Sequence, residues 1–308
     1  MITHLRAASA ILCGLMLSSF GFGTLLPLLA ARDQPKVTAS SPGECGQFTF
    51  AKLSPNSLSL EIQEMSGLTL SGTEADTLVH VQDSGNDPVL TYTKRDGSIL
   101  ASYRYGDKNS DSEELARGEC PWGGACIFVF DTGDNFHWRS QRSIWAVDEA
   151  TLKTDKIRSE KIDFKFPGEE KADVEAAVVI GKTIYLFVKE PKHSRVFALS
   201  TGVWKGENAE AKLITDLPYT MVTGAAASTD GSRILLLNWQ GVVEMTKAGT
   251  GSKSADGWFP YRRRIKIKSL AQQEAITFDH DQKSFLYSSE KKLFSNREWG
   301  IMQATCTP

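Results

Sequence analysis

The sequence predicts an all-β protein of the β-propeller class, because a unit of about fifty residues recurs along the chain. Four similar short segments each begin with a glutamate, at Glu64, Glu113, Glu175 and Glu274. These glutamates are separated by 49, 62 and 99 residues, and Thr223 divides the longest interval into 48 and 51. Strand-like units of this length are typical of propeller blades. Five blades are predicted, and six is the alternative if the long second unit holds further strands.

Each predicted unit contains further short runs rich in β-branched and aromatic residues, which are typical of strands. A second run lies at 78–81, 127–130, 184–188, 234–237 and 285–287. A third lies at 89–93, 144–147, 195–199, 241–245 and 293–294, and a fourth at 99–105, 211–214 and 262–267. No stretch beyond the N-terminal segment has a sustained helical period, so each unit is predicted to be one antiparallel sheet.

Both ends of the repeat region also carry strand-like runs, at 47–53 and at 301–305. A propeller commonly builds one blade from the two ends of its chain. The sequence therefore predicts that the N- and C-terminal strands share a blade and close the ring.

Four cysteines lie outside the N-terminal segment, and their positions agree with this closure. The short, turn-rich segment between Cys120 and Cys126 favours a local disulfide, which leaves Cys45 to pair with Cys306 at the ends of the domain. A zinc site of four cysteines is the alternative, although the close pair spacing of such sites is absent.

The first 31 residues are predicted to be a signal peptide. Residues 7–31 carry no charge, follow Arg6 and end before Arg32. The apolar run is long for a signal peptide, so an uncleaved membrane anchor is the alternative. Residues 32–44 then form a linker, and 45–308 form the propeller domain. Together with the disulfides, this organisation predicts a secreted or periplasmic protein.

Composition limits the partners that we expect. The 35 Lys and Arg residues nearly balance 37 Asp and Glu residues, for a net charge of −2. No basic stripe is present, so nucleic acid is not an expected partner. A small molecule or a cell-envelope ligand is expected instead, bound by a monomer that meets a membrane only if the N-terminal segment stays uncleaved.

Blade topology gathers the acidic residues on one face. In an antiparallel blade the first strand begins where the second strand ends, so polar groups at both places surround the same end of the central channel. Their oxygens are the ligands that Ca²⁺ prefers. The candidate metal ligands are Glu64, Asp83, Glu113, Asp131, Asp134 and Glu175. The candidate ligand-binding residues are Asn135, Arg139, Lys189 and Glu274. The alternative is that these acids tie neighbouring blades together through backbone amides and basic side chains.

Three segments resemble a known family. They are Glu64-Met-Ser-Gly-Leu with 81–88, Asp111-Ser-Glu-Glu-Leu-Ala with 131–135, and 173–176 with 185–189. They resemble motifs of a family of secreted bacterial β-propellers, largely uncharacterised and distantly similar to phytase-like esterase propellers. The resemblance covers about residues 60–295 and implies the propeller fold, with metal-assisted phosphoester hydrolysis as a candidate activity. Ser112 departs from the family's motif, which has tryptophan there.

Three functional hypotheses follow. The first is a propeller that binds a ligand or partner on its acidic channel face, with Ca²⁺ as the candidate cofactor. The second is a calcium-dependent, phytase-like phosphoesterase, and the third is a structural or interaction module of the cell envelope. No nucleophile and general base stand at a recognisable spacing, so no catalytic residue is assigned and enzymatic activity stays open.

Overall fold

The computed structural model describes residues 45–54, 58, 62–247, 258–291 and 296–307 of the chain. The predicted signal peptide and linker lie outside these residues. Within the described part, no helix is long and apolar enough to cross a membrane. The chain that is described is built from strands, joined by turns and three short 3-10 segments: η2 (Glu149–Thr151), η3 (Pro167–Glu169) and η4 (Thr201–Lys205).

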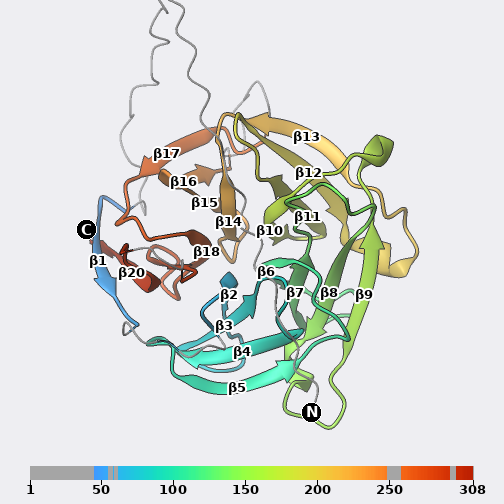
Figure 1. The fold of residues 1–308 in the computed structure, drawn as a ribbon, viewed down its shortest axis with the longest axis horizontal. Helices are drawn as coiled ribbons and strands as arrows, with labels where there is room; N and C mark the ends of the chain where they lie inside the picture. The colour runs from blue at the N-terminus through green and yellow to red at the C-terminus, as the bar shows by residue number, and fades with distance from the viewer. Residues whose placement is uncertain (1–44, 55–57, 59–61, 248–257, 292–295, 308) are drawn as a thin grey trace, which may run out of the picture. The chain divides into compact units, whose positions relative to one another are not determined.

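Five four-stranded antiparallel sheets surround a central channel as the blades of a propeller (Figure 1). Within each blade, the strands are given in order from the channel outward. Blade one contains β2 (Met65–Leu70), β3 (Thr77–Gln82), β4 (Val89–Lys94) and β5 (Ile99–Arg104). Blade two contains β6 (Ser112–Glu119), β7 (Ala125–Asp131), β8 (Arg142–Asp148) and β9 (Ser159–Phe164). Blade three contains β10 (Val174–Ile180), β11 (Thr183–Val188), β12 (Ser194–Ser200) and β13 (Lys212–Leu217). Blade four contains β14 (Val222–Ala227), β15 (Arg233–Asn238), β16 (Gly241–Thr246) and β17 (Tyr261–Ile265).

Blade five joins the two ends of the described chain, as the sequence predicts. It contains β18 (Gln273–Phe278), β19 (Phe285–Ser289), β20 (Gly300–Thr307) and, outermost, β1 (Gln47–Lys52). β1 pairs with β20 in an antiparallel register that runs from Gln47 opposite Thr307 to Lys52 opposite Met302. The predicted third run at 293–294 lies outside the described residues, and β20 occupies the third place in this blade.

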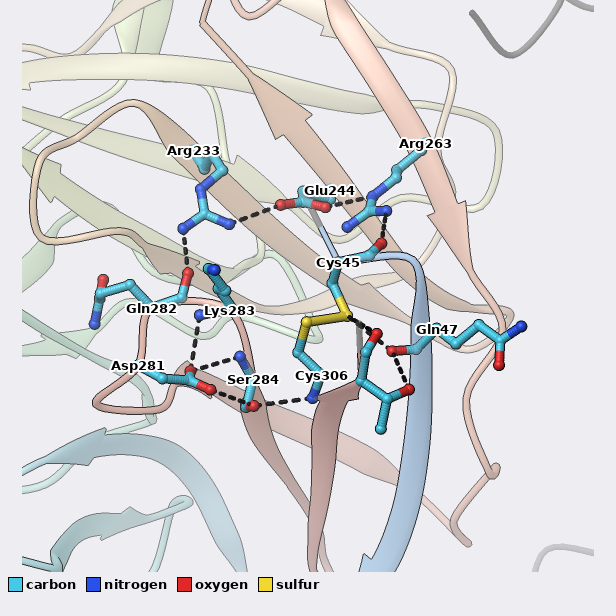
Figure 2. Close-up of a disulfide and its surroundings, with 11 residues drawn as sticks. Cys45, Gln47, Arg233, Glu244, Arg263, Asp281, Gln282, Lys283, Ser284 and Cys306 are labelled. Atoms are coloured by element: carbon cyan, nitrogen blue, oxygen red, sulfur yellow. Dashed lines mark hydrogen bonds and ion pairs between the residues drawn. A yellow bond between two sulfur atoms is a disulfide. The ribbon is translucent and has the colours of Figure 1, made fainter. Parts of the chain in front are cut away.

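Both predicted disulfides are present. Cys45 is bonded to Cys306 across the closing blade, with their Cα atoms 5.5 Å apart (Figure 2). Cys120 is bonded to Cys126 around the turn between β6 and β7. Blade four also holds the N-terminal end of β1, because Arg263 Nη1 donates to the Cys45 carbonyl oxygen at 2.5 Å. Glu244 accepts from Arg263 at 2.5 Å and so fixes that guanidinium.

The hydrophobic core lies between neighbouring blades rather than in one central mass. The inner strands are buried along almost their whole length, whereas outermost strands such as β1 and β5 alternate between partly buried and exposed positions. Neighbouring blades approach closely at Gly67 and Gly224. A Cβ atom at Gly67 would lie 2.7 Å from the Leu115 nitrogen, and one at Gly224 would lie 2.5 Å from the Glu274 carbonyl oxygen.

Candidate functional site: the acidic mouth of the channel

Every innermost strand carries a β-bulge near its start, at an equivalent position in all five blades. The bulged residues are Ser66, Glu113, Glu175, Thr223 and Glu274. Bulges redirect side chains locally, and here they do so at one end of the channel. The predicted repeat is thus correct in four blades and wrong in the first, where Ser66 rather than Glu64 is equivalent to the other glutamates.

Seven carboxyl groups gather at this end of the channel, which we call the acidic mouth. They come from the starts of inner strands and the ends of second strands, as the topology predicts. The acidic mouth comprises Asp83, Asp111, Glu113, Asp173, Glu175, Glu274 and Glu290.

Asp83, Asp111 and Glu113 form the tightest group in the acidic mouth. One carboxylate oxygen of each lies within 4.8 Å of the others. Burial raises the pKa of Glu113 well above its usual value, and the charges of Asp83 and Asp111 raise it further. Burial also raises the pKa of Asp111 to about 7, with a further contribution from Asp83. Ser66 donates to Glu113 at 2.7 Å.

Gly133 makes room for this group. A Cβ atom there would lie 2.1 Å from Glu113 Oε1 and 2.6 Å from Asp111 Oδ2. The loop from 132 to 141, between β7 and β8, therefore packs directly against two of the three carboxylates. Any larger residue at Gly133 would displace them.

Lys189 neutralises a second part of the mouth. Its ammonium pairs with Glu175 and lies 3.4 Å from Asp173 Oδ2. It also donates to Asn135 Oδ1 at 3.1 Å. Glu175, Asn135 and Lys189, all predicted site residues, are thus brought together, but in an ion pair rather than around an open position.

Glu274 and Glu290 form the third part. The Glu274 side chain is buried, with the residue 7% exposed, and its Oε2 has no hydrogen-bond partner among the described residues. Burial raises its pKa to about 7. Burial, and then the charges of Glu274 and Asp83, raise the pKa of Glu290 to about 8. Asp83 and Lys189, from blades one and three, both act electrostatically on Glu274, so its carboxyl lies within range of groups from both of those blades.

Asp131 and Asp134 lie on the same face but already have partners. Asp131 accepts from the Asp111 backbone N–H at 3.0 Å and from Arg139 Nη2 at 2.7 Å. Asp134 accepts from the Trp138 N–H at 2.8 Å and from the buried Arg142 at 2.6 Å. These contacts are those of the alternative interpretation, in which acids tie loops and blades together. A metal-ligating role for this pair stays a prediction.

Glu64 lies at the edge of the mouth. It is exposed and accepts from Asn86 Nδ2 at 2.7 Å. It contributes to the raised pKa of Glu290 and so lies within electrostatic range of that carboxyl. Its role as a metal ligand also stays a prediction.

Glu114 is a buried structural residue of the channel that the sequence analysis did not single out. Its carboxylate accepts from the Ala225 N–H at 2.7 Å and from the Leu115 N–H at 2.9 Å, so it crosses the channel from blade two to blade four. Burial raises its pKa well above the usual value. The sequence does distinguish this position from its equivalents in the other blades. The residue after the bulge is small in the other four blades, where it is Gly67, Ala176, Gly224 or Ala275.

A cavity of about 650 Å³ occupies the opposite end of the channel. The far halves of the inner strands line it, including Leu70, Val179 and Phe278. Glu114 crosses the channel between this cavity and the acidic mouth. The two ends of the channel are therefore chemically different.

No protein-family model and no curated protein matches this sequence. Among solved structures, a Myxococcus xanthus glutaminyl cyclase is similar with 10% identity, a TM-score of 0.47, and coverage of 84% of this chain and 94% of that one. A nidogen/laminin complex is similar with 12% identity, a TM-score of 0.45, and coverage of 73% of this chain and 72% of that one. Kuenenia stuttgartiensis hydrazine synthase is similar with 14% identity, a TM-score of 0.43, and coverage of 82% of this chain and 66% of that one. Likeness this distant carries no argument about what this chain does. The resemblance to phytase-like propellers gains no support from these comparisons.

Proposed function

We propose that this protein is a ligand-binding propeller whose acidic mouth holds Ca²⁺ on Asp83, Asp111 and Glu113. The observation that carries the proposal is the grouping of these three carboxylates within 4.8 Å. Ca²⁺ binds oxygens at about 2.3–2.6 Å, so two of its ligands can stand up to roughly 5 Å apart. The spacing of the three oxygens is therefore compatible with one shared ion.

Electrostatics supports the same site. Burial and mutual repulsion make ionisation of Asp111 and Glu113 costly, as their raised pKa values indicate. A divalent cation would offset both costs at once. Three carboxylates supply only part of the six to eight oxygens that Ca²⁺ takes, which leaves positions for water or for a bound ligand.

The phosphoesterase alternative has no specific observation in its favour. Phosphate needs free cations beside the metal. Lys189 pairs with Glu175 and Asp173, Arg139 pairs with Asp131, and Arg142 pairs with Asp134. The two disulfides are typical of oxidising compartments and support a secreted or periplasmic location as part of the proposal.

Calorimetric titration of CaCl₂ into the purified protein tests the site. We expect saturable binding by the wild type and its loss in the double variant Asp83→Asn, Asp111→Asn, which keeps side-chain shape but removes two charges. At a free concentration one hundred times the Kd, Ca²⁺ should also stabilise the fold by about 2.7 kcal/mol.

Asp155→Asn is the matched control, because Asp155 is exposed in the connection between β8 and β9. That connection lies at the opposite end of blade two. Equal binding by the double variant and the wild type, or no binding at millimolar calcium, would contradict the proposal. Release of phosphate from phytate in the same samples would instead favour the esterase alternative.

A further inference from the structure

Two carboxyl groups of the acidic mouth would have no cation in contact even with Ca²⁺ in place. Lys189 is paired with Glu175 and Asp173, and the proposed ion would serve Asp83, Asp111 and Glu113. Glu274 and Glu290 remain, and neither has a basic partner among the contacts that the structure describes. Gln272 donates to Glu290 at 2.6 Å, which satisfies a lone pair without supplying charge.

Glu274 provides the evidence that another group binds in the acidic mouth. Its Oε2 is enclosed and unpartnered among the described residues, although the residue is more than nine-tenths buried. A buried carboxylate without a partner is costly to a fold. Its carboxyl lies at the start of an innermost strand, within electrostatic range of Asp83 and Asp173. A cation bound among these carboxyl groups would therefore also act on Glu274.

Exposed aromatic side chains border the same mouth on two sides. Phe136 and Trp138 are 71% and 75% exposed and stack with their ring centroids 4.8 Å apart. They lie in the loop after β7, only a few residues from Gly133, which touches the carboxylates of Asp111 and Glu113. Trp239, 60% exposed, follows β15 on blade four.

Hydrogen bonds hold the backbone at or next to both aromatic positions. Asp134 accepts from the Trp138 N–H and from Arg142, which fixes the loop that presents the stacked pair. On the other side, Gln273 Nε2 donates to the carbonyl oxygen of Asn238, the residue before Trp239, at 2.5 Å, which ties that turn to the strand that carries Glu274. Exposed aromatic side chains are typical anchors of protein-recognition surfaces.

We propose that this face binds a partner polypeptide that inserts a lysine or arginine side chain into the acidic mouth beside Glu274 and Glu290. Apolar residues flanking that side chain lie on Trp239 and on the Phe136–Trp138 pair. The aromatic residues come from blades two and four, on opposite sides of the channel, so the surface fits an extended chain better than a small free amine. This inference rests on the proposed use of the mouth as a cation site, but not on calcium itself.

Fluorescence anisotropy with labelled pentapeptide pools tests it. One pool has lysine at its central position and random flanking residues, and the other has norleucine, which is apolar and of similar length. We expect the lysine pool to bind at least about tenfold more tightly. Glu274→Gln with Glu290→Gln should remove that preference, whereas Asp155→Asn should leave it intact.

A second pair of variants separates the aromatic contribution. Trp239→Ala and Trp138→Ala should each weaken binding of the lysine pool about tenfold, while Leu100→Ala, an exposed apolar change on outer strand β5, should not. Equal binding of the two pools would overturn the inference. So would the absence of binding by either pool up to about 1 mM peptide. Equally tight binding of N-acetyl-lysine amide would overturn the polypeptide as the occupant.

Calcium and EDTA arms keep the two proposals apart. If the lysine pool binds in EDTA while calorimetry detects no heat of calcium binding, that result would refute the metal site and support this inference. Calcium binding without any preference for the lysine pool would do the reverse.

Discussion

The disulfide that closes the ring should stabilise the fold far more than the local one. Cys45–Cys306 spans 261 residues of sequence and Cys120–Cys126 spans 6. In the chain-entropy model these separations correspond to about 5.5 and about 2 kcal/mol. Both values are for the unfolded state, where a longer bridged loop loses more conformational freedom. Six residue pairs join β1 to β20, and we expect them to remain when either disulfide is removed.

Urea unfolding of two double variants measures the difference. Cys45→Ser with Cys306→Ser should lose about 3 kcal/mol more stability than Cys120→Ser with Cys126→Ser, which is the matched control. Both variants should keep the propeller's circular dichroism spectrum in the absence of urea. An equal loss in the two variants, or a larger loss from the local bridge, would refute the reasoning that chain closure is what the terminal cysteines provide.

Three further predictions concern single buried groups. Asp134→Asn should destabilise the protein by about 3–5 kcal/mol, because it leaves the buried Arg142 guanidinium without its charge partner; chemical unfolding measures this, and a loss below 1 kcal/mol would contradict it. Burial lowers the pKa of His80 from 6.5 to about 3, so the folded state binds this proton less readily than the unfolded chain. The stability that His80 contributes is present above pH 6.5 and falls by about 2 kcal/mol between pH 7.5 and 5; a His80→Leu variant should lack this part of the slope, and parallel pH profiles would argue against it. Glu114→Ala should cost about 1–3 kcal/mol, because channel-facing N–H groups of Leu115 and Ala225 lose their acceptor; unchanged thermal unfolding would show that water replaces the carboxylate.

The fold was predictable because its determinants are periodic or terminal. The fifty-residue repeat is written in short strand runs, and Cys45 and Cys306 stand at the two ends of the domain. The phase of blade one was not predictable in the same way. Glu64 precedes the strand at nearly the spacing of the other glutamates, but the bulge places Ser66 at the equivalent position. A shift of two residues preserves strand alternation, so the pattern of apolar residues does not reveal it.

The candidate site was predictable only to the level of a face. Strand direction alone brings Asp83, Asp111 and Glu113 to one end of the channel. Which acids become paired depends on the loop after β7, whose path brings Arg139 to Asp131 and brings Asp134 to Arg142 at the start of β8. Loop paths have no periodic pattern in sequence. The carboxylates that pair with arginine could therefore not be distinguished beforehand from those that do not.

A crystal structure grown in millimolar CaCl₂ tests the central claim most directly. The account predicts an anomalous density peak in the acidic mouth, with Asp83, Asp111 and Glu113 oxygens at about 2.3–2.6 Å. The Asp131–Arg139 and Asp134–Arg142 pairs should remain intact in that structure. A peak at Asp131 and Asp134 with those pairs broken, or no peak at the mouth at all, would contradict it.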